Sequence, residues 1–284
     1  MKKDRVLEIL NSNDLKAQSK FGQNFLCNDE ITERIVDVSD IRPDSRVLEI
    51  GPGLGALTEA ILHRSNGEMQ YKAIEIDRGL VEYLENEPFI GLNALIDCAD
   101  FTKLKREDYV EYHDFDFVVS NIPYYVMAPI IKKLLIECGT AEKMTFMVEQ
   151  DAIERIVAKP DTKQYGPLAV LCAVYGKVNK EFSVPADCFY PAPHTLSAVI
   201  TLTKKITFDD DDIFVITPEF SKFLDSCFSM RRKTLYNCLS TNFGSFSLKM
   251  SILNAIEKLG YNTKVRAESI KPDDFVELYK LLLL

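Results

Sequence analysis

The sequence predicts an α/β protein in which a mostly parallel sheet is followed by a small all-helical domain. Three observations lead to this prediction. Apolar strand patterns alternate with helical patterns through the first half of the chain, and a glycine-rich turn joins the first of these strands to a helix. Beyond residue 212, apolar residues recur at helical spacing. Strands that alternate with helices are typical of a parallel sheet covered on both faces.

The first strands of the expected sheet are short apolar segments, at residues 46–50, 70–76, 92–97, 115–120 and 143–149. Helical patterns occur between them, at residues 56–63, 78–86 and 127–138. Residues 178–184 and 196–203 also have β-type composition, and we expect them to close the sheet as late, antiparallel strands. The expected sheet then has seven strands.

A polar segment at residues 204–212 ends in four consecutive aspartates and indicates a linker. After it, helical periodicity is found at residues 220–228, 252–259 and 275–279. The sequence therefore predicts one domain over residues 1–204 and a helical domain over residues 213–284.

Composition is that of an ordinary globular protein, since 46% of the 284 residues are hydrophobic and 27% are charged. No apolar run is long enough to span a membrane, and the charged first residues lead into no signal core. We therefore expect a cytoplasmic protein without a membrane partner. The seven cysteines are widely spaced and form no Cys-x-x-Cys pair, which argues against disulfides and a metal site. No heptad pattern requires a partner chain, so we expect a monomer.

The net charge of −9 is not that of a generally basic protein, so a nucleic-acid-binding face would be a local patch. Residues 221–284 hold ten Lys and Arg against six Asp and Glu. Within them, Arg231, Arg232 and Lys233 are the best candidates for contacts with phosphates. A solvated helix end would explain the same three residues, and composition leaves both interpretations open.

A glycine-rich turn at residues 49–55 (Glu-Ile-Gly-Pro-Gly-Leu-Gly) lies where a strand gives way to a helix. Such turns let a ligand approach the backbone, and they occur in NAD, FAD and S-adenosylmethionine sites alike. Glu75, at the end of the second strand, is placed to accept hydrogen bonds from ribose hydroxyls, and Asp100, after the third, to accept one from an adenine amine. Because parallel strands end at one edge of the sheet, Glu49, Glu75 and Asp100 are expected to converge on a nucleoside cofactor.

The fourth expected strand ends in Asn121-Ile122-Pro123-Tyr124, the most specific pattern in the chain. Adenine N6 is a weak nucleophile because its lone pair is delocalised into the ring. Two acceptors aimed at its hydrogens would free that lone pair, and the Asn121 side chain and the Ile122 carbonyl, held by Pro123, are suitable. Tyr124 would stack on the purine. The alternative is an Asn-x-Pro turn with core tyrosines.

The chain resembles, over nearly its whole length, the ribosomal RNA adenine N6-dimethyltransferases (dimethyladenosine transferases of the kasugamycin-sensitivity, KsgA, type). The family's motifs are matched by Phe21–Leu26, Gly51–Thr58, Asn121–Tyr124, Phe189–Pro193 with Ser197, Arg231–Leu235 and Arg266–Glu268. The resemblance implies a Rossmann-like class I methyltransferase sheet with a small C-terminal all-α domain. It also implies that S-adenosylmethionine is used to dimethylate two adjacent adenosines in the 3′-terminal hairpin loop of small-subunit (16S) rRNA, during ribosome biogenesis.

The resemblance also assigns roles to residues that match its motifs. Those expected to contact S-adenosylmethionine are Asn24, Leu26, Gly51, Glu75, Asp100 and Asn121. Those expected to form the target-base pocket are Ile122, Pro123, Tyr124 and Phe189, with Asn121 and Tyr124 as the catalytic residues. Arg231, Arg232 and Lys233 are expected to bind the rRNA of the small ribosomal subunit.

The chain departs from the family at two places. Tyr125 stands where many members carry asparagine, and His194-Thr195-Leu196 is an unusual version of the segment after the two prolines. Three other functions are weighed against the main one: a resistance methylase acting on large-subunit rRNA, an assembly factor whose binding matters more than its methylation, and a nucleotide-dependent oxidoreductase. The Gly-Pro-Gly-Leu-Gly turn favours the small-subunit enzyme over the resistance methylase, and the Asn-Ile-Pro-Tyr motif disfavours the oxidoreductase.

Overall fold

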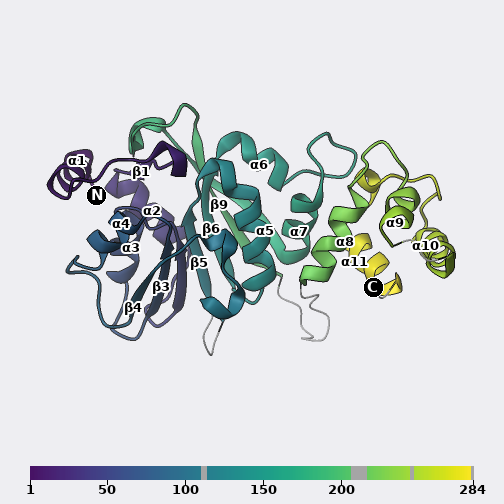
Figure 1. Cartoon of the computed structure of the whole chain (residues 1–284), viewed down its shortest axis with the longest axis horizontal. Coiled ribbons are helices and arrows are strands. Elements are labelled where there is room, and N and C mark those ends of the chain that lie inside the picture. Colours follow the sequence, from purple (N-terminus) through teal and green to yellow (C-terminus); the bar gives the residue numbers. More distant parts are fainter. Residues whose placement is uncertain (110–113, 206–215, 244–245, 283–284) are drawn as a thin grey trace. The chain divides into compact units, whose positions relative to one another are not determined.

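The computed structural model describes residues 1–109, 114–205, 216–243 and 246–282 (Figure 1). Contacts between residues divide the chain into two units, Met1–Ile153 with Val178–Lys204, and Glu154–Lys177 with Lys205–Leu284. Residues 154–177 thus belong to the second unit, although the predicted boundaries placed them in the first domain. Most of the predicted linker lies outside the described residues.

The first unit is built on a seven-stranded sheet with the strand order β4-β3-β2-β5-β6-β9-β7. Its strands are β2 (Arg46–Ile50), β3 (Gln70–Glu75), β4 (Ala94–Cys98), β5 (Phe117–Asn121), β6 (Lys143–Glu149), β7 (Gly176–Val184) and β9 (Ser197–Lys204). The strands from β4 to β6 in this order are parallel, and β9 runs antiparallel to β6. Each predicted strand is confirmed, with bounds shifted by two residues or fewer.

Both faces of the central strands are covered, because residues 117–120 of β5 and 144–148 of β6 are buried without interruption. Helices α2 (Asp29–Val38) and α3 (Ala56–Leu62) share one core with these strands, in which Ile35, Ile61 and Val119 pack together. Helices α1 (Lys3–Ser12) and α4 (Arg78–Leu84) contribute to a second cluster. The helix after β5 is α5 (Met127–Glu137), and α6 (Gln150–Ile156) follows β6.

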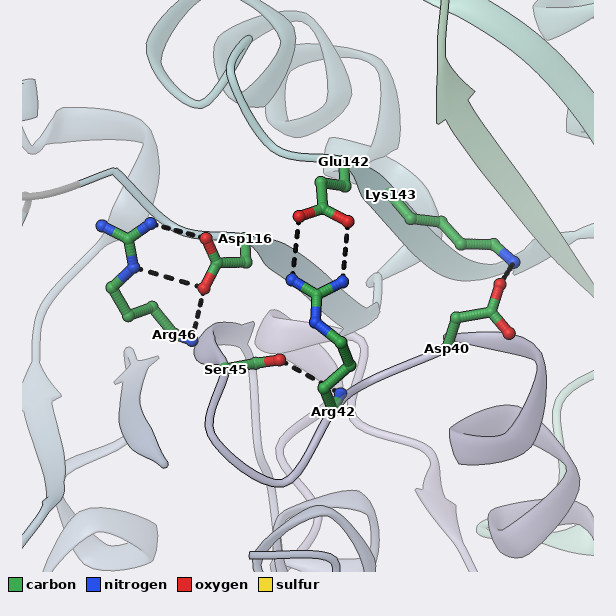
Figure 2. A network of polar contacts seen from close by, with 7 residues as sticks. All are labelled: Asp40, Arg42, Ser45, Arg46, Asp116, Glu142 and Lys143. Carbon is green, nitrogen blue, oxygen red and sulfur yellow. Dashed lines mark hydrogen bonds and ion pairs between the residues drawn. The ribbon is translucent and has the colours of Figure 1, made fainter. Parts of the chain in front are cut away.

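Ion pairs brace the amino ends of three neighbouring strands (Figure 2). Arg46, the first residue of β2, contacts Asp116 just before β5 at 2.5 Å, and its backbone N–H donates to the same carboxylate. Arg42 makes two hydrogen bonds, of 2.7 and 2.8 Å, to Glu142 just before β6. Paired contacts of this kind fix geometry, although each partly exposed pair contributes at most about 1 kcal/mol. The opposite, carboxyl end of the sheet holds the candidate site.

The second unit contains α7 (Pro167–Tyr175), α8 (Pro218–Cys227), α9 (Leu235–Phe243), α10 (Phe246–Lys258) and α11 (Pro272–Leu282). Aromatic rings fill its core: Phe220 and Phe223 of α8 lie 5.3 and 5.4 Å from the ring of Tyr279 on α11. Helix α7 is apolar on all sides and buried, which is why no helical period marks it in the sequence. No helix in the described residues is both long enough and apolar enough to pass through a membrane.

Candidate active site

A cavity of about 230 Å³ lies at the carboxyl ends of the parallel strands, beside β2 and β5, where the strand order reverses. Ligands bind at such switch points in open α/β sheets. Residues from the amino-terminal segment, the glycine-rich turn and the ends of β3, β4 and β5 line it. The predicted site residues among them are Asn24, Leu26, Gly51, Glu75, Asp100, Asn121, Ile122 and Pro123.

The glycine-rich turn needs glycine at three positions. Gly51, Gly53 and Gly55 have φ angles of +71°, +61° and +81°, a region that other residues rarely adopt. At Gly55, which caps α3, a Cβ atom would also come within 2.7 Å of Leu84 on α4. The turn therefore keeps its backbone open to a ligand while α3 and α4 approach closely.

Glu75 anchors this turn from the end of β3. Its Oε2 accepts a hydrogen bond from the Gly53 N–H at 3.1 Å, and its Oε1 accepts one from the Asp77 N–H at 2.9 Å. Burial raises the pKa of Glu75, and these two N–H donors oppose that shift. Each oxygen retains a lone pair for a ligand hydroxyl. Glu75 therefore suits the role of a ribose acceptor on the pocket wall.

Asp100 lies on the wall formed by the end of β4. Its Oδ1 accepts hydrogen bonds from the hydroxyl and the N–H of Thr102, at 2.6 and 3.1 Å, and Lys103 lies 3.0 Å from Oδ2. The Thr102 hydroxyl, helped by Lys103, lowers the pKa of Asp100. The carboxylate is thus an ionised acceptor, as contact with an adenine amine requires.

Glu49 is a fully buried carboxyl group that lines the same cavity. Its Oε2 accepts hydrogen bonds from Thr58 at 3.0 Å and Tyr71 at 2.5 Å, whereas its Oε1 is buried with no donor among the described residues. Burial raises the pKa of Glu49 to about 7, although the hydrogen bonds from Tyr71 and Thr58 act to lower it. An unpaired acceptor of this kind fits a pocket for a positively charged ligand.

This carboxyl group makes stability depend on pH. Because the pKa of Glu49 is about 7 in the folded protein and 4.5 when unperturbed, the folded state keeps a proton that the unfolded chain releases. The stabilisation from this retained proton is fully present below about pH 4.5 and is lost as the pH rises through about 7. Across this range the free energy of unfolding falls by up to roughly 3 kcal/mol. We expect Glu49→Gln to flatten the pH dependence of the free energy of unfolding across this range, measured by urea denaturation. Exposed Glu82→Gln is the control, and an unchanged slope in Glu49→Gln would contradict the assignment.

An amino-terminal strap, residues 18–26, is fastened beside the pocket at three points. Gln18 and Gln23 donate hydrogen bonds to Oδ2 of Asp77, at 2.6 and 2.9 Å. The Asn121 side chain donates to the Asn24 carbonyl at 3.1 Å. The third point is a two-stranded antiparallel sheet, in which β1 (Phe25–Leu26) pairs with β8 (Phe189–Tyr190).

Sequence reasoning missed two of these fastening residues, Gln18 and Asp77. Asp77 is the N-cap of α4 and accepts a hydrogen bond from the Gly79 N–H, so an acidic residue before a helical pattern was the available signal. No local signal marked Gln18, because its partner lies on another element.

The end of β5 orients the predicted catalytic motif. Because Nδ2 of Asn121 donates to the strap, Oδ1 remains as the acceptor, and no donor from the described residues bonds it. Ile122 is buried, and its N–H donates to Met147 on β6 at 3.2 Å. After Pro123 the chain enters the turn η4 (Tyr124–Val126), and the Tyr124 side chain lies outside the part of the structure that is described.

Phe189 does not reach the pocket. Its side chain is 2% exposed and packs in the core of the first unit, where β8 pairs it with Leu26 of β1. A base could contact Phe189 only if this core opened. The structure therefore does not place Phe189 with the other predicted pocket residues, and it supports the strap through β8 instead.

Arg231, Arg232 and Lys233 lie in the second unit, in the turn before α9. Arg231 donates to the Lys163 carbonyl at 2.7 Å and lies 3.9 Å from Glu268, so part of its hydrogen-bonding capacity is used. Arg232 and Lys233 are exposed and form no ion pair with the residues that the structure describes. They are therefore the two members of the cluster most available to a phosphate.

The strand order, with a carboxylate-lined cavity over its switch point, defines a methyltransferase of the Rossmann-like type. The family model described as ribosomal RNA adenine dimethylase matches residues 14–283. The chain therefore belongs to the ribosomal RNA adenine dimethylase family and is an rRNA methyltransferase, which confirms the predicted family and enzyme class.

Individual relatives agree with this. A ribosomal RNA small subunit methyltransferase A from Geobacillus kaustophilus is 34% identical over 288 residues, covering 98% of this chain and 95% of that protein. The protein of the same name from Pediococcus pentosaceus is 32% identical over 284 residues, covering 97% of this chain and 93% of that protein. A solved dimethyladenosine transferase from Plasmodium falciparum has a TM-score of 0.70 at 25% identity and covers 90% of this chain and 96% of its own.

Proposed function

We propose that the protein uses S-adenosylmethionine to dimethylate N6 of two adjacent adenosines in the 3′-terminal hairpin loop of small-subunit rRNA, as a step in ribosome biogenesis. The observation that carries this proposal is the orientation of Asn121, whose amide is fixed by the strap so that Oδ1 is left as an acceptor. The named relatives are small-subunit enzymes, which favours this substrate over large-subunit rRNA.

The pocket residues fit the cofactor. Bound S-adenosylmethionine would supply a methyl group already activated on its sulfonium sulfur. Glu75 and the glycine-rich turn would hold the ribose, Asp100 the adenine amine, and Asn24, Leu26, Gly51 and Asn121 would complete the contacts. The unpaired Oε1 of Glu49 would balance positive charge in the bound cofactor.

The chain's own part in the reaction is to bind and orient the target amine. Oδ1 of Asn121 and the Ile122 carbonyl would accept hydrogen bonds from N6, which favours a pyramidal nitrogen with an available lone pair. Pro123 restrains the backbone at this point, and Tyr124 would stack on the purine. No strong base is required, because the proton on N6 can leave to solvent after transfer. Rate enhancement would come mainly from alignment and hydrogen-bond polarisation.

We further propose that the protein acts as a monomer in the cytoplasm, where the second unit binds rRNA phosphates. Replacing Arg232 and Lys233 by glutamate is expected to weaken binding to small subunits about 10- to 100-fold at low salt, because two phosphate contacts become repulsive. Affinity falls as salt rises, and the negative slope of log affinity against log salt should become shallower by roughly 1.4 to 1.8. Affinity for S-adenosylmethionine should not change.

Filter binding and calorimetry would measure these two affinities. The matched control reverses Lys249 and Lys258 on α10, which changes the net charge of the same unit equally. Equal loss in the control would show a response to net charge alone. Loss of cofactor affinity together with RNA affinity would indicate misfolding and contradict the assignment.

The function is tested by methyl transfer from radiolabelled S-adenosylmethionine to unmethylated small and large ribosomal subunits, with the nucleoside product identified. Dimethyladenosine in small-subunit rRNA is the expected result. Label in the large subunit would move the protein to the resistance methylases. No transfer to either subunit, with cofactor still bound, would contradict the proposed substrate.

A further inference from the structure

An exposed tyrosine stands at the rim of the pocket. Tyr125 lies in the turn η4, directly after the Asn-Ile-Pro-Tyr motif, and lines the cavity. Its side chain is 62% exposed, and no other phenylalanine or tyrosine side chain that the structure describes is exposed. A large flat ring that stays in water beside a binding site is suited to contact with another flat group.

The position of this ring is fixed by the strap. Gly22 has a φ angle of +61°, and a Cβ atom there would lie 3.3 Å from both Cδ1 and Cε1 of Tyr125. The same Cβ would lie 3.7 Å from Cβ of Pro123, so the strap backbone packs against the motif as well as the ring. Gln18, Gln23 and Asn24 fasten this part of the strap. Tyr125 therefore presents a surface that is ordered in advance, which lowers the entropy cost of a contact.

The chemistry of the substrate supplies a group for this surface. A target adenosine must leave its stack to enter the pocket, and its neighbour in the strand then loses a stacking partner. An aromatic side chain can replace that partner whatever the base is, because each base has a π-face.

We propose that Tyr125 stacks on the nucleobase next to the target adenosine and thereby holds the RNA strand at the pocket rim. This proposal rests on the proposed function, and it assigns Tyr125 to positioning of the substrate. The ring is the active group, since stacking does not use the hydroxyl.

The test combines protein variants with altered RNA. Tyr125→Ala is expected to lower kcat/KM for unmethylated small subunits roughly tenfold, mainly through KM, whereas Tyr125→Phe stays within about twofold of the wild type. The affinity for S-adenosylmethionine, measured by calorimetry, should be the same in all three proteins. Leu92→Ala removes an exposed apolar side chain outside the pocket and is the matched control.

Subunits reconstituted with an abasic residue on the 5′ or the 3′ side of the target separate stacking from a structural role. At one of these two positions, the abasic residue should lower kcat/KM of the wild type roughly tenfold relative to intact RNA. The same residue should lower kcat/KM of Tyr125→Ala less than about twofold. Equal abasic penalties in both proteins, or loss of cofactor affinity in Tyr125→Ala, would overturn the proposal. A wild type that methylates no small subunit would overturn the proposed function and this inference with it.

Discussion

Asn121→Ala is expected to lower kcat/KM for methyl transfer about 100- to 1,000-fold, by analogy with the loss of one preorganised hydrogen-bonding group in other active sites. The substitution removes Oδ1, the acceptor that we propose binds the target amine. It also removes Nδ2, which donates to the Asn24 carbonyl of the strap. Initial rates of label incorporation into unmethylated small subunits measure the effect.

Two further variants sharpen this prediction. Asn121→Asp keeps an oxygen acceptor but loses the donor to Asn24, so it should also be strongly impaired. Asn86→Ala makes the same truncation at an exposed asparagine of the same unit and should leave the rate unchanged. A rate for Asn121→Ala within about tenfold of the wild type would contradict the catalytic role, since that is only about 1.4 kcal/mol. An inactive Asn121→Ala that still supports subunit maturation would favour the assembly-factor alternative.

Glu75→Ala is expected to weaken S-adenosylmethionine binding about 100-fold or more, because hydrogen bonds to a charged group contribute about 1.5–3 kcal/mol each. Two effects act together. The ribose loses its acceptor, and the Gly53 N–H loses the carboxylate that anchors the glycine-rich turn. Isothermal titration calorimetry measures the dissociation constant directly.

The control for this prediction is Glu82→Ala, a carboxylate on the exposed side of α4. It should bind the cofactor as the wild type does. If Glu75→Ala kept its affinity while remaining folded, the cofactor would have to bind elsewhere. Retained affinity would therefore contradict the assignment of the whole pocket as the S-adenosylmethionine site, as well as the role of Glu75.

Much of the fold could be predicted because its signals are local. Buried parallel strands such as β5 and β6 are short and mostly apolar in their interiors. The site residues Glu75 and Asn121 are the last residues of their strands, and Asp100 follows β4 by two residues. Helix α7 escaped prediction because it is apolar on every side and so has no period. Strands β1 and β8 escaped because two residues carry no alternation and their pairing joins distant parts of the chain.

Side-chain direction was the harder part of the site. Phe189 belongs to a motif near the pocket, yet its ring faces the core, because β8 pairs with β1 and turns it inward. The partners of Glu49 come from α3 and β3, and the partners of Asp77 come from the strap, so neither set follows from spacing along the sequence. Motifs locate residues near a site, whereas packing between elements decides which of them face it.

The position of β9 has a consequence for synthesis of the chain. Although β9 is the last strand in the sequence, it lies between β6 and β7 in the sheet. While the polypeptide is still emerging from the ribosome, one edge of β6 stays unpaired until residues 197–204, which form β9, have been synthesised. An unpaired strand edge can join to another nascent chain. Strand β5, which ends in the proposed catalytic motif, is thus inside its sheet early, but the neighbouring edge of β6 is covered only after residues 197–204 have been synthesised.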